Sequence, residues 1–195
     1  MPIAQPDREA PPQPSSHPGS DGTVRLARLA PDHLQGLADL SHDRDVQLFT
    51  YAPSPREEGF ERKLLERYEE GHEDGSRAGF AIVDEGTGEF LGFAALVRID
   101  VAGREAEAGY IVVPEARGRG IAGRALGLLT DWALADLGLE RVELRISQEN
   151  VPSLKVAERA GFVREGVLRS MHFKQGKRVD LVLFSRIRAD HPALS

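Results

Sequence analysis

The most informative stretch of this chain is Pro114-Glu115-Ala116-Arg117-Gly118-Arg119-Gly120-Ile121-Ala122-Gly123, which places three glycines and two arginines between an apolar strand pattern and an apolar helix pattern. Glycine lacks a Cβ, so a ligand can approach its backbone closely. The first N–H groups of a helix have no partner within the helix, and the helix dipole favours negative charge beside them. The stretch therefore predicts a cradle for an anionic cofactor that carries phosphate groups.

The glycine spacing also fits a second kind of phosphate site, because residues 118–123 satisfy the dinucleotide-binding pattern G-x-G-x-x-G. That pattern lies directly after the first strand of a βαβ series, with an acidic residue about 20 positions on, near Glu140 and Glu143 here. In this chain residues 114–117 separate the strand from the glycines, and most of the sheet-forming sequence precedes them. The order of the elements therefore favours a different fold from the dinucleotide-binding one.

Strand and helix patterns flank the glycine loop on both sides. Strands are predicted over residues 24–29, 80–83, 90–97, 105–113, 141–146, 167–173 and 179–187. Helices are predicted over 31–45, from the capping box at Ser54 to about 71–75, over 121–137, and from Asn150 to Gly161. A meander followed by one βαβ crossover predicts an α+β (mixed α/β) fold, with a mostly antiparallel sheet of six to seven strands and about four helices on its faces.

The length and composition predict one folded domain with two tails. At 195 residues and 41% hydrophobic content the chain can bury one substantial core, which we place at residues 23–188. Residues 1–22 are rich in proline and poor in apolar side chains, so we expect a disordered tail there and a short C-terminal tail at 189–195. No secretory signal and no run of about 18 apolar residues is found, so we expect a soluble protein that does not bind membranes.

Charge and cysteine content narrow the classes of function. The absence of cysteine excludes disulfides and thiolate catalysis, and it fits a cytoplasmic location. The formal net charge of −6 argues against a nucleic-acid partner and mildly favours cationic partners such as amines. His42, Asp43 and Asp45 lie close in sequence, but no further ligand stands at a convincing spacing, so we predict no metal site.

Four motifs, in order along the chain, carry a resemblance to a known family. They are Glu107-Ala108-Gly109-Tyr110, the loop from Arg117 to Ala122, Asn150-Val151-Pro152-Ser153, and Glu158-Arg159-Ala160-Gly161-Phe162. Over residues 23–188 the chain resembles the GNAT superfamily of acyl-CoA-dependent N-acetyltransferases, most closely its RimJ/RimL-type branch of ribosomal-protein N-terminal acetyltransferases. The resemblance implies a GNAT-like fold whose fourth and fifth strands splay apart around the pantetheine arm of acetyl-CoA.

The resemblance also implies which residues bind acetyl-CoA. Val112 and Val113 would offer backbone hydrogen bonds to the pantetheine amides. The pyrophosphate would lie on Arg117, Gly118, Arg119, Gly120, Ile121 and Ala122, which agrees with the anion cradle predicted above. The alternative for the two arginines is a solvated loop. Asn150 has two compatible roles, as the cap of its helix and as a partner of the cofactor arm.

Glu107 is the residue that we assign as catalytic base, acting through water on the attacking amine. Period-two alternation places it on one face with Gly109, Ile111 and Val113, so its carboxylate would lie on a partly apolar stripe, where burial raises a pKa. The alternative is that Glu105 and Glu107 form only the wet face of an edge strand.

Ser153 is the candidate that protonates, or donates a hydrogen bond to, the departing CoA thiolate. Many relatives carry a tyrosine seven residues after the asparagine, whereas this chain has Ala157 there. A serine in the first turn of a helix also satisfies local backbone groups, so that alternative stays open. A thiol with a pKa of about 8.5 needs only modest help to leave.

The acceptor side of the site is less well defined. Tyr110 and His172 are candidate substrate-pocket side chains, with ordinary packing as the alternative. Asp43, Asp45 and Glu57 are expected near the mouth through which a cationic acceptor would enter.

We therefore predict an N-acetyltransferase that moves acetyl from acetyl-CoA to a primary amine by direct attack. The resemblance implies a protein N-terminal α-amine, whose pKa of about 8 makes it easier to activate than lysine at about 10.4. The alternatives are a small-molecule amine such as a polyamine or aminoglycoside, and a non-catalytic acyl-CoA-binding module. A homodimer is among the assemblies to be tested.

Overall fold

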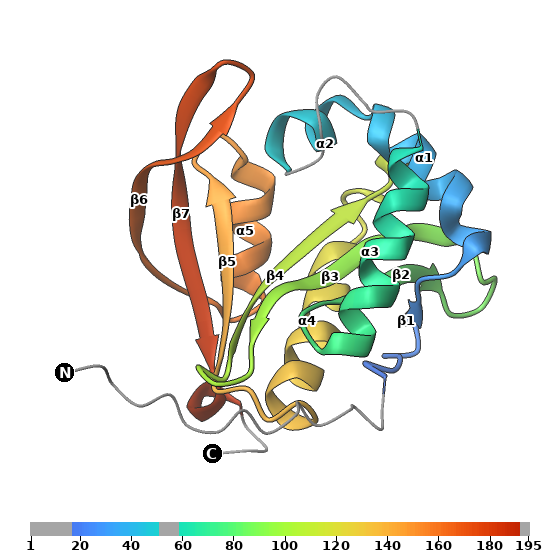
Figure 1. Cartoon of the computed structure of the whole chain (residues 1–195), viewed down its shortest axis with the longest axis horizontal. Helices are drawn as coiled ribbons and strands as arrows, with labels where there is room; N and C mark the ends of the chain where they lie inside the picture. The colour runs from blue at the N-terminus through green and yellow to red at the C-terminus, as the bar shows by residue number, and fades with distance from the viewer. Residues whose placement is uncertain (1–16, 51–58, 192–195) are drawn as a thin grey trace.

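A seven-stranded sheet carries five α-helices in the computed structural model, which describes residues 17–50 and 59–191 (Figure 1). The strands are β1 (Val24–Arg28), β2 (Ala78–Asp84), β3 (Phe90–Asp100), β4 (Glu105–Val112), β5 (Arg141–Ser147), β6 (Val163–Lys174) and β7 (Lys177–Ile187). The helices are α1 (Leu34–His42), α2 (Arg44–Phe49), α3 (Phe60–Asp74), α4 (Ile121–Ala135) and α5 (Val151–Arg159). The spatial order of the strands is β1-β2-β3-β4-β5-β7-β6.

The fourth and fifth strands diverge in the middle of this sheet. Every other pair of neighbours is antiparallel, whereas β4 and β5 are parallel and pair only from Glu105 to Glu107, opposite Arg141 to Glu143. Beyond Glu107, β4 follows β3 and β5 follows β7, so the two strands separate (Figure 1). The α+β fold and the splayed strands are thus confirmed, with seven strands.

The number of helices needs a correction from about four to five within the described residues. The helix predicted over 31–45 is interrupted at Asp43, whose backbone is extended with φ −66° and ψ 133°. One carboxylate oxygen of Asp43 accepts hydrogen bonds from the N–H groups of Asp45 and Val46, at 3.0 Å each. Aspartate is a favoured N-cap, so it starts the separate helix α2. The capping box at Ser54 lies outside the described residues.

Hydrophobic side chains cover the two faces of the sheet differently. On one face, Leu37 of α1 and Leu65 and Tyr68 of α3 pack on Phe93 and neighbours from β2 and β3. On the other face α4 is buried across the sheet, and its Trp132 meets Phe80 edge to face at 5.3 Å. Each such large side chain, when fully buried, contributes about 1.5–3 kcal/mol. The helices α1 and α3 contact β2 and β3, so they leave the same face of β5, β7 and β6 uncovered.

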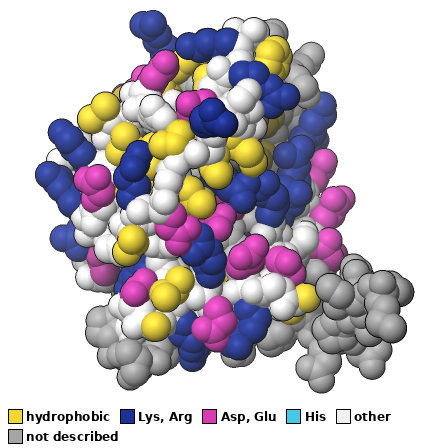
Figure 2. Space-filling view, turned by 90° about the vertical axis from the view of Figure 1, so that its left-hand side faces the viewer, with side chains coloured by type: hydrophobic (Ala, Val, Ile, Leu, Met, Phe, Trp, Pro, Cys, Tyr) yellow, Lys and Arg dark blue, Asp and Glu magenta, His cyan; other side chains and the backbone are white. Residues whose placement is uncertain are grey.

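The uncovered face carries charges that pair across strands. Arg141 of β5 contacts Glu143 at 2.8 Å and Glu165 of β6 at 2.5 Å, and Ser185 of β7 donates to Glu165 at 2.6 Å. Seen from the side of the molecule where β6 lies, hydrophobic side chains gather among Lys and Arg in the upper half (Figure 2). The exposed hydrophobic side chains of β6 include Val163, Val167, Met171 and Phe173.

The first described residues contact the domain. Ser20 forms a backbone bridge with Arg25, and Asp21 makes an ion pair of 2.7 Å with Arg124 of α4. Residues 1–16 and 192–195, which belong to the two predicted tails, lie outside the described residues.

In the part of the chain that the structure describes, no helix has the length and hydrophobicity needed to span a membrane.

Candidate active site

A cavity of about 540 Å³ opens where β4 and β5 diverge. Helices α1, α2 and α3 form one wall, and β4, β5, the start of α5 and β6 form the other. Five residues predicted for the site line it together, namely Glu107, Tyr110, Asn150, Ser153 and His172. The residues predicted to hold the pyrophosphate lie outside its lining, at the start of α4.

Glu107 is buried, with 6% of its side chain exposed, on the sheet face that packs against α3. Its carboxylate makes an ion pair with Arg98 of β3 and approaches Nε of Arg145 of β5 at 3.5 Å. Arg145 in turn contacts Glu143 at 3.2 Å. The position expected for Glu107 is therefore observed, together with two arginine partners that sequence reasoning missed.

Arg98 reaches Glu107 because β3 is irregular at this point. The register between β3 and β4 shifts between Val97 and Asp100, and Arg98 has a positive φ of 55°. Regular alternation would send Arg98 to the opposite face from Val97, which lies opposite Glu107. A non-glycine residue in this conformation costs about 1 kcal/mol or more, and such strain is concentrated at functional sites. The bulge redirects the guanidinium into the cavity.

Tyr110 and Ser153 form a hydroxyl pair across the cavity. The Tyr110 Oη and Ser153 Oγ atoms are 2.7 Å apart, although the residues come from β4 and from the first turn of α5. Asn150 caps this helix, since its Oδ1 accepts a hydrogen bond of 3.2 Å from the Ser153 N–H. Burial raises the pKa of Tyr110 to about 12, and the hydrogen bond with Ser153 acts in the opposite direction. The phenol is therefore protonated at neutral pH, and its hydroxyl also lies 3.3 Å from the Ser153 carbonyl oxygen, to which it can donate.

His172 lies on β6 at the opposite side of the cavity from α1. Burial lowers its pKa below the ordinary value, and the charges of Lys174 and Arg178 act in the same direction. The imidazole is therefore neutral at pH 7.

The glycine loop has an open backbone. Gly118 and Gly120 have φ values of 74° and 80°, which other residues rarely adopt, and Gly120 precedes α4 without a side-chain cap. A Cβ added at Gly118, Gly120 or Gly123 would meet no heavy atom within 4 Å. Ile121 is buried in the core, so it and Ala122 can offer only backbone N–H groups to an anion. This geometry fits the diphosphate of a CoA cofactor.

Arg117 has a different environment from Arg119. Its three nitrogens donate to the Val112 carbonyl at 3.1 Å, to Asp43 at 2.7 Å and to Asp45 at 3.0 Å. Partial burial disfavours the charge of Asp43, but hydrogen bonds from Arg117 and from backbone N–H groups hold its pKa below the ordinary value. Arg117 thus joins the glycine loop to α2, and these two aspartates contact Arg117 rather than line the cavity.

Val112 and Val113 also differ in their backbone contacts. The Val113 N–H donates to the Leu91 carbonyl of β3 at 2.9 Å. Successive residues of a strand direct their backbone N–H and C=O groups to opposite edges of the strand. Because Val113 directs its N–H toward β3, Val112 directs its N–H toward the opening between β4 and β5. Val112 is therefore the residue whose N–H faces the expected place of the pantetheine arm.

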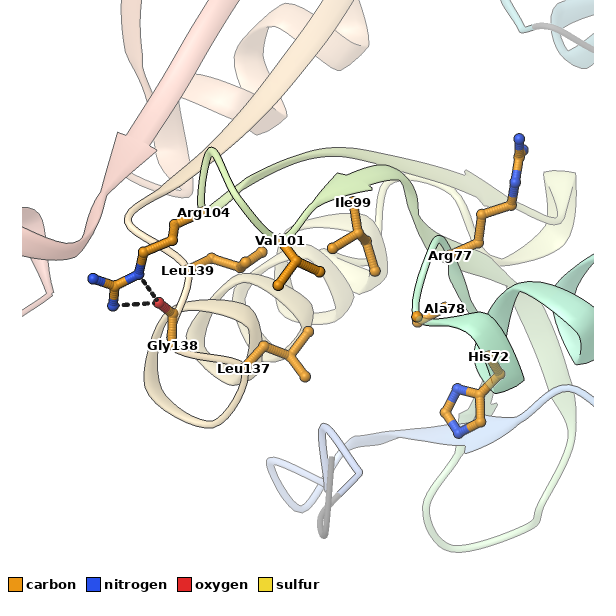
Figure 3. A pocket seen from close by; sticks show the side chains of 10 residues that line it. His72, Arg77, Ala78, Ile99, Val101, Arg104, Leu137, Gly138 and Leu139 are labelled. Atoms are coloured by element: carbon orange, nitrogen blue, oxygen red, sulfur yellow. Dashed lines mark hydrogen bonds between the residues drawn. The ribbon is translucent and has the colours of Figure 1, made fainter. Parts of the chain in front are cut away.

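A second cavity, of about 340 Å³, lies at the far end of the sheet between α3, the turn from β3 to β4, and the end of α4 (Figure 3). Its apolar lining includes Ile99, Val101, Leu137 and Leu139. Arg104 donates two hydrogen bonds, of 3.0 and 2.6 Å, to the Gly138 carbonyl. The described residues that line this second cavity include no carboxylate and no hydroxyl group. Nowhere in residues 17–50 and 59–191 do three His, Asp or Glu residues lie close enough to hold a metal ion.

The chain is similar to known proteins in sequence and in fold. Residues 23–163 match the family profile described as the acetyltransferase (GNAT) domain. The spermidine N(1)-acetyltransferase of Escherichia coli K12 is 30% identical over 166 residues, which cover 84% of this chain and 83% of that protein. An uncharacterised N-acetyltransferase of Bacillus licheniformis is 30% identical over 118 residues, and the match spans 60% of this chain and 66% of that protein.

A solved structure shows the same fold. It is that of RimL, named as a ribosomal alpha-N-protein acetyltransferase, in complex with coenzyme A. The TM-score is 0.77 at 22% sequence identity, and the superposition covers 87% of this chain and 96% of the other.

Proposed function

The chain belongs to the GNAT acetyltransferase family and is an N-acetyltransferase that uses acetyl-CoA, and from this premise we propose that its acceptor is the α-amine at the N-terminus of a protein. Two of the relatives named above act on different amines, one on a polyamine and the other on a ribosomal-protein N-terminus. The acceptor must therefore be argued from the cavity of this chain. A cytoplasmic location and a homodimer stay predictions.

The observation that carries the proposal is the environment of Glu107. It is the only carboxylate among the described residues that line the cavity, and it is in contact with two arginines. A polyamine has several positive charges, which one shared carboxylate does not match. An α-amine has a pKa of about 8, so on the order of a tenth is neutral at pH 7 and little activation is needed. The cavity therefore suits a single α-amine better than a polycation.

The chemistry assigns a role to each end of the cavity. Acetyl-CoA supplies a thioester, at which a C–N bond forms as the C–S bond breaks, while the amine loses a proton and the CoA sulfur gains one. Glu107 would accept the proton of the amine, directly or through water. Tyr110 would donate to Ser153 Oγ, which leaves the Ser153 hydroxyl hydrogen for the sulfur. A thiol with a pKa of about 8.5 needs no stronger acid.

The cofactor is held by the backbone more than by side chains. The open N–H groups between Gly118 and Ala122, with the charge of Arg119, would bind the diphosphate, and Val112 would contact the pantetheine arm. Arg117 supports the loop through Asp43 and Asp45.

The test is thiol release from acetyl-CoA with peptides that begin with free Ala, Ser, Thr or Met, with the same peptides blocked at the N-terminus, and with spermidine. We expect release with the free peptides, none with the blocked peptides, and slower release with spermidine. Turnover of spermidine together with silence on every peptide would replace the proposal with polyamine acetylation, the alternative that the Escherichia coli relative favours.

A further inference from the structure

Four arginines line the active-site cavity on the acceptor side. They are Arg67 of α3, Arg77 just before β2, Arg98 of β3 and Arg145 of β5. Glu107 is the one carboxylate among the described lining residues, and His172 is neutral at pH 7. Four positive charges therefore face one negative charge, although the whole chain has a formal net charge of −6. The net charge of the residues that line the cavity is thus positive, whereas the net charge of the whole chain is negative.

The four arginines divide into two pairs. Arg98 and Arg145 share the carboxylate of Glu107, and Arg145 also pairs with Glu143, which does not line the cavity. In residues 17–50 and 59–191, Arg67 and Arg77 have no ion-pair partner, and both line the cavity together with Tyr68. Two guanidinium groups without a carboxylate partner among the described residues, in the same cavity lining as Arg98 and Arg145, form a place that favours an anion.

Packing fixes the position of Arg77. A Cβ added at Gly71 would lie 2.7 Å from the Arg77 Cβ, so the missing side chain at Gly71 lets the stem of Arg77 lie directly on α3. The guanidinium of Arg77 points away from the second cavity (Figure 3). The stem is therefore held by packing, and the charged end stays available to the active-site cavity.

We infer that the acceptor carries carboxylate groups close to its reacting amine, as does a protein N-terminus with Asp or Glu at its second and third positions. This inference rests on the proposed function and specifies its substrate class. Arginine binds a carboxylate through two parallel hydrogen bonds, so Arg67 and Arg77 would hold the acidic side chains while the amine reaches Glu107. The same charges repel spermidine and lysine-rich peptides.

The test compares three peptides that differ only at positions two and three, where they carry Glu-Glu, Gln-Gln or Lys-Lys after an N-terminal serine. We expect kcat/KM for thiol release to be roughly tenfold higher for the Glu peptide than for the Gln peptide, and lowest for the Lys peptide. High salt should reduce the difference. Arg67→Ala and Arg77→Ala should remove most of the Glu preference without changing the KM for acetyl-CoA.

The matched control is Arg62→Ala, which removes an arginine from the same helix that does not line the cavity and should keep the preference. A second measurement needs no turnover: binding of the N-acetylated Glu and Lys peptides by calorimetry. Acetylation of all three free peptides at equal rates would overturn the charge inference and leave the proposed function intact. Absence of acetylation, with Arg67-dependent binding of the acidic peptide, would overturn the proposed function and support the anion site. Absence of both acetylation and Arg67-dependent binding would overturn the proposed function and the charge inference together.

Discussion

Tyr110 and Ser153 show how single residues complete the site. Tyr110→Phe keeps the ring in place but removes the hydroxyl that lies 2.7 Å from Ser153 Oγ. A neutral hydrogen bond contributes about 0.5–1.5 kcal/mol, so we expect kcat to fall about threefold to tenfold, with the KM for acetyl-CoA unchanged. Steady-state kinetics with both substrates varied would measure the change.

A double variant separates a shared role of the two hydroxyls from independent roles. If Tyr110 acts by orienting Ser153, then Tyr110→Phe combined with Ser153→Ala should be no slower than Ser153→Ala alone. Losses that multiply would mean that each hydroxyl acts separately. Equal melting temperatures for the single variants would show that the kinetic effect is not a folding defect.

Residues at regular positions were predictable, and those at irregular positions were not. Alternation along one strand placed Glu107 on a partly apolar face, and the structure finds it buried there. The same alternation puts Arg145 and Glu143 on one face of β5, so this pairing was available in the sequence. Arg98 was not predictable, because it reaches Glu107 only through a bulge and a positive φ. A bulge depends on tertiary packing, for which the local sequence gives no signal.

Helix α2 illustrates the element scale, where Arg117 connects the cofactor loop to the acceptor wall. Arg117→Ala would remove the contacts with Asp43 and Asp45 and release the start of α2. The ion pair with Asp45 is largely exposed, so it is worth at most about 1 kcal/mol. We expect the KM for the peptide acceptor to rise about threefold to fivefold, more than the KM for acetyl-CoA, in steady-state assays.

Arg119→Ala is the matched control from the same loop. Arg119 is exposed and makes no ion pair in the described residues, so its loss should raise the KM for acetyl-CoA and leave that of the acceptor unchanged. If instead Arg117→Ala raises the KM for acetyl-CoA and Arg119→Ala does not, Arg117 binds the diphosphate, as the sequence resemblance implies.

Most elements were predictable because their patterns are local. The strands, the glycine loop and the cap at Asn150 each follow from residues within a few positions of one another. The division between α1 and α2 could have been found from Asp43, which is a favoured N-cap, but the leucine spacing before it suggested one continuous helix. The partners of Arg117 depend on that division, so they were missed too.

At the scale of the whole molecule, the charges on the uncovered face of β5, β7 and β6 link stability to pH. Hydrogen bonds from Arg141 and then Ser185 lower the pKa of Glu165 to about 2, against an ordinary value of 4.5. A lowered pKa in the folded state means that the stabilisation is fully present above pH 4.5 and is lost as the pH falls toward 2. Because Glu165 is 36% exposed, solvent screening limits the effect to about 1 kcal/mol. Urea unfolding of the wild type and of Glu165→Gln from pH 2 to 7 should therefore show a constant difference above pH 5 that disappears near pH 2. A difference that grows on acidification would contradict the sign of this linkage and remove Glu165 from the groups that hold the strands together.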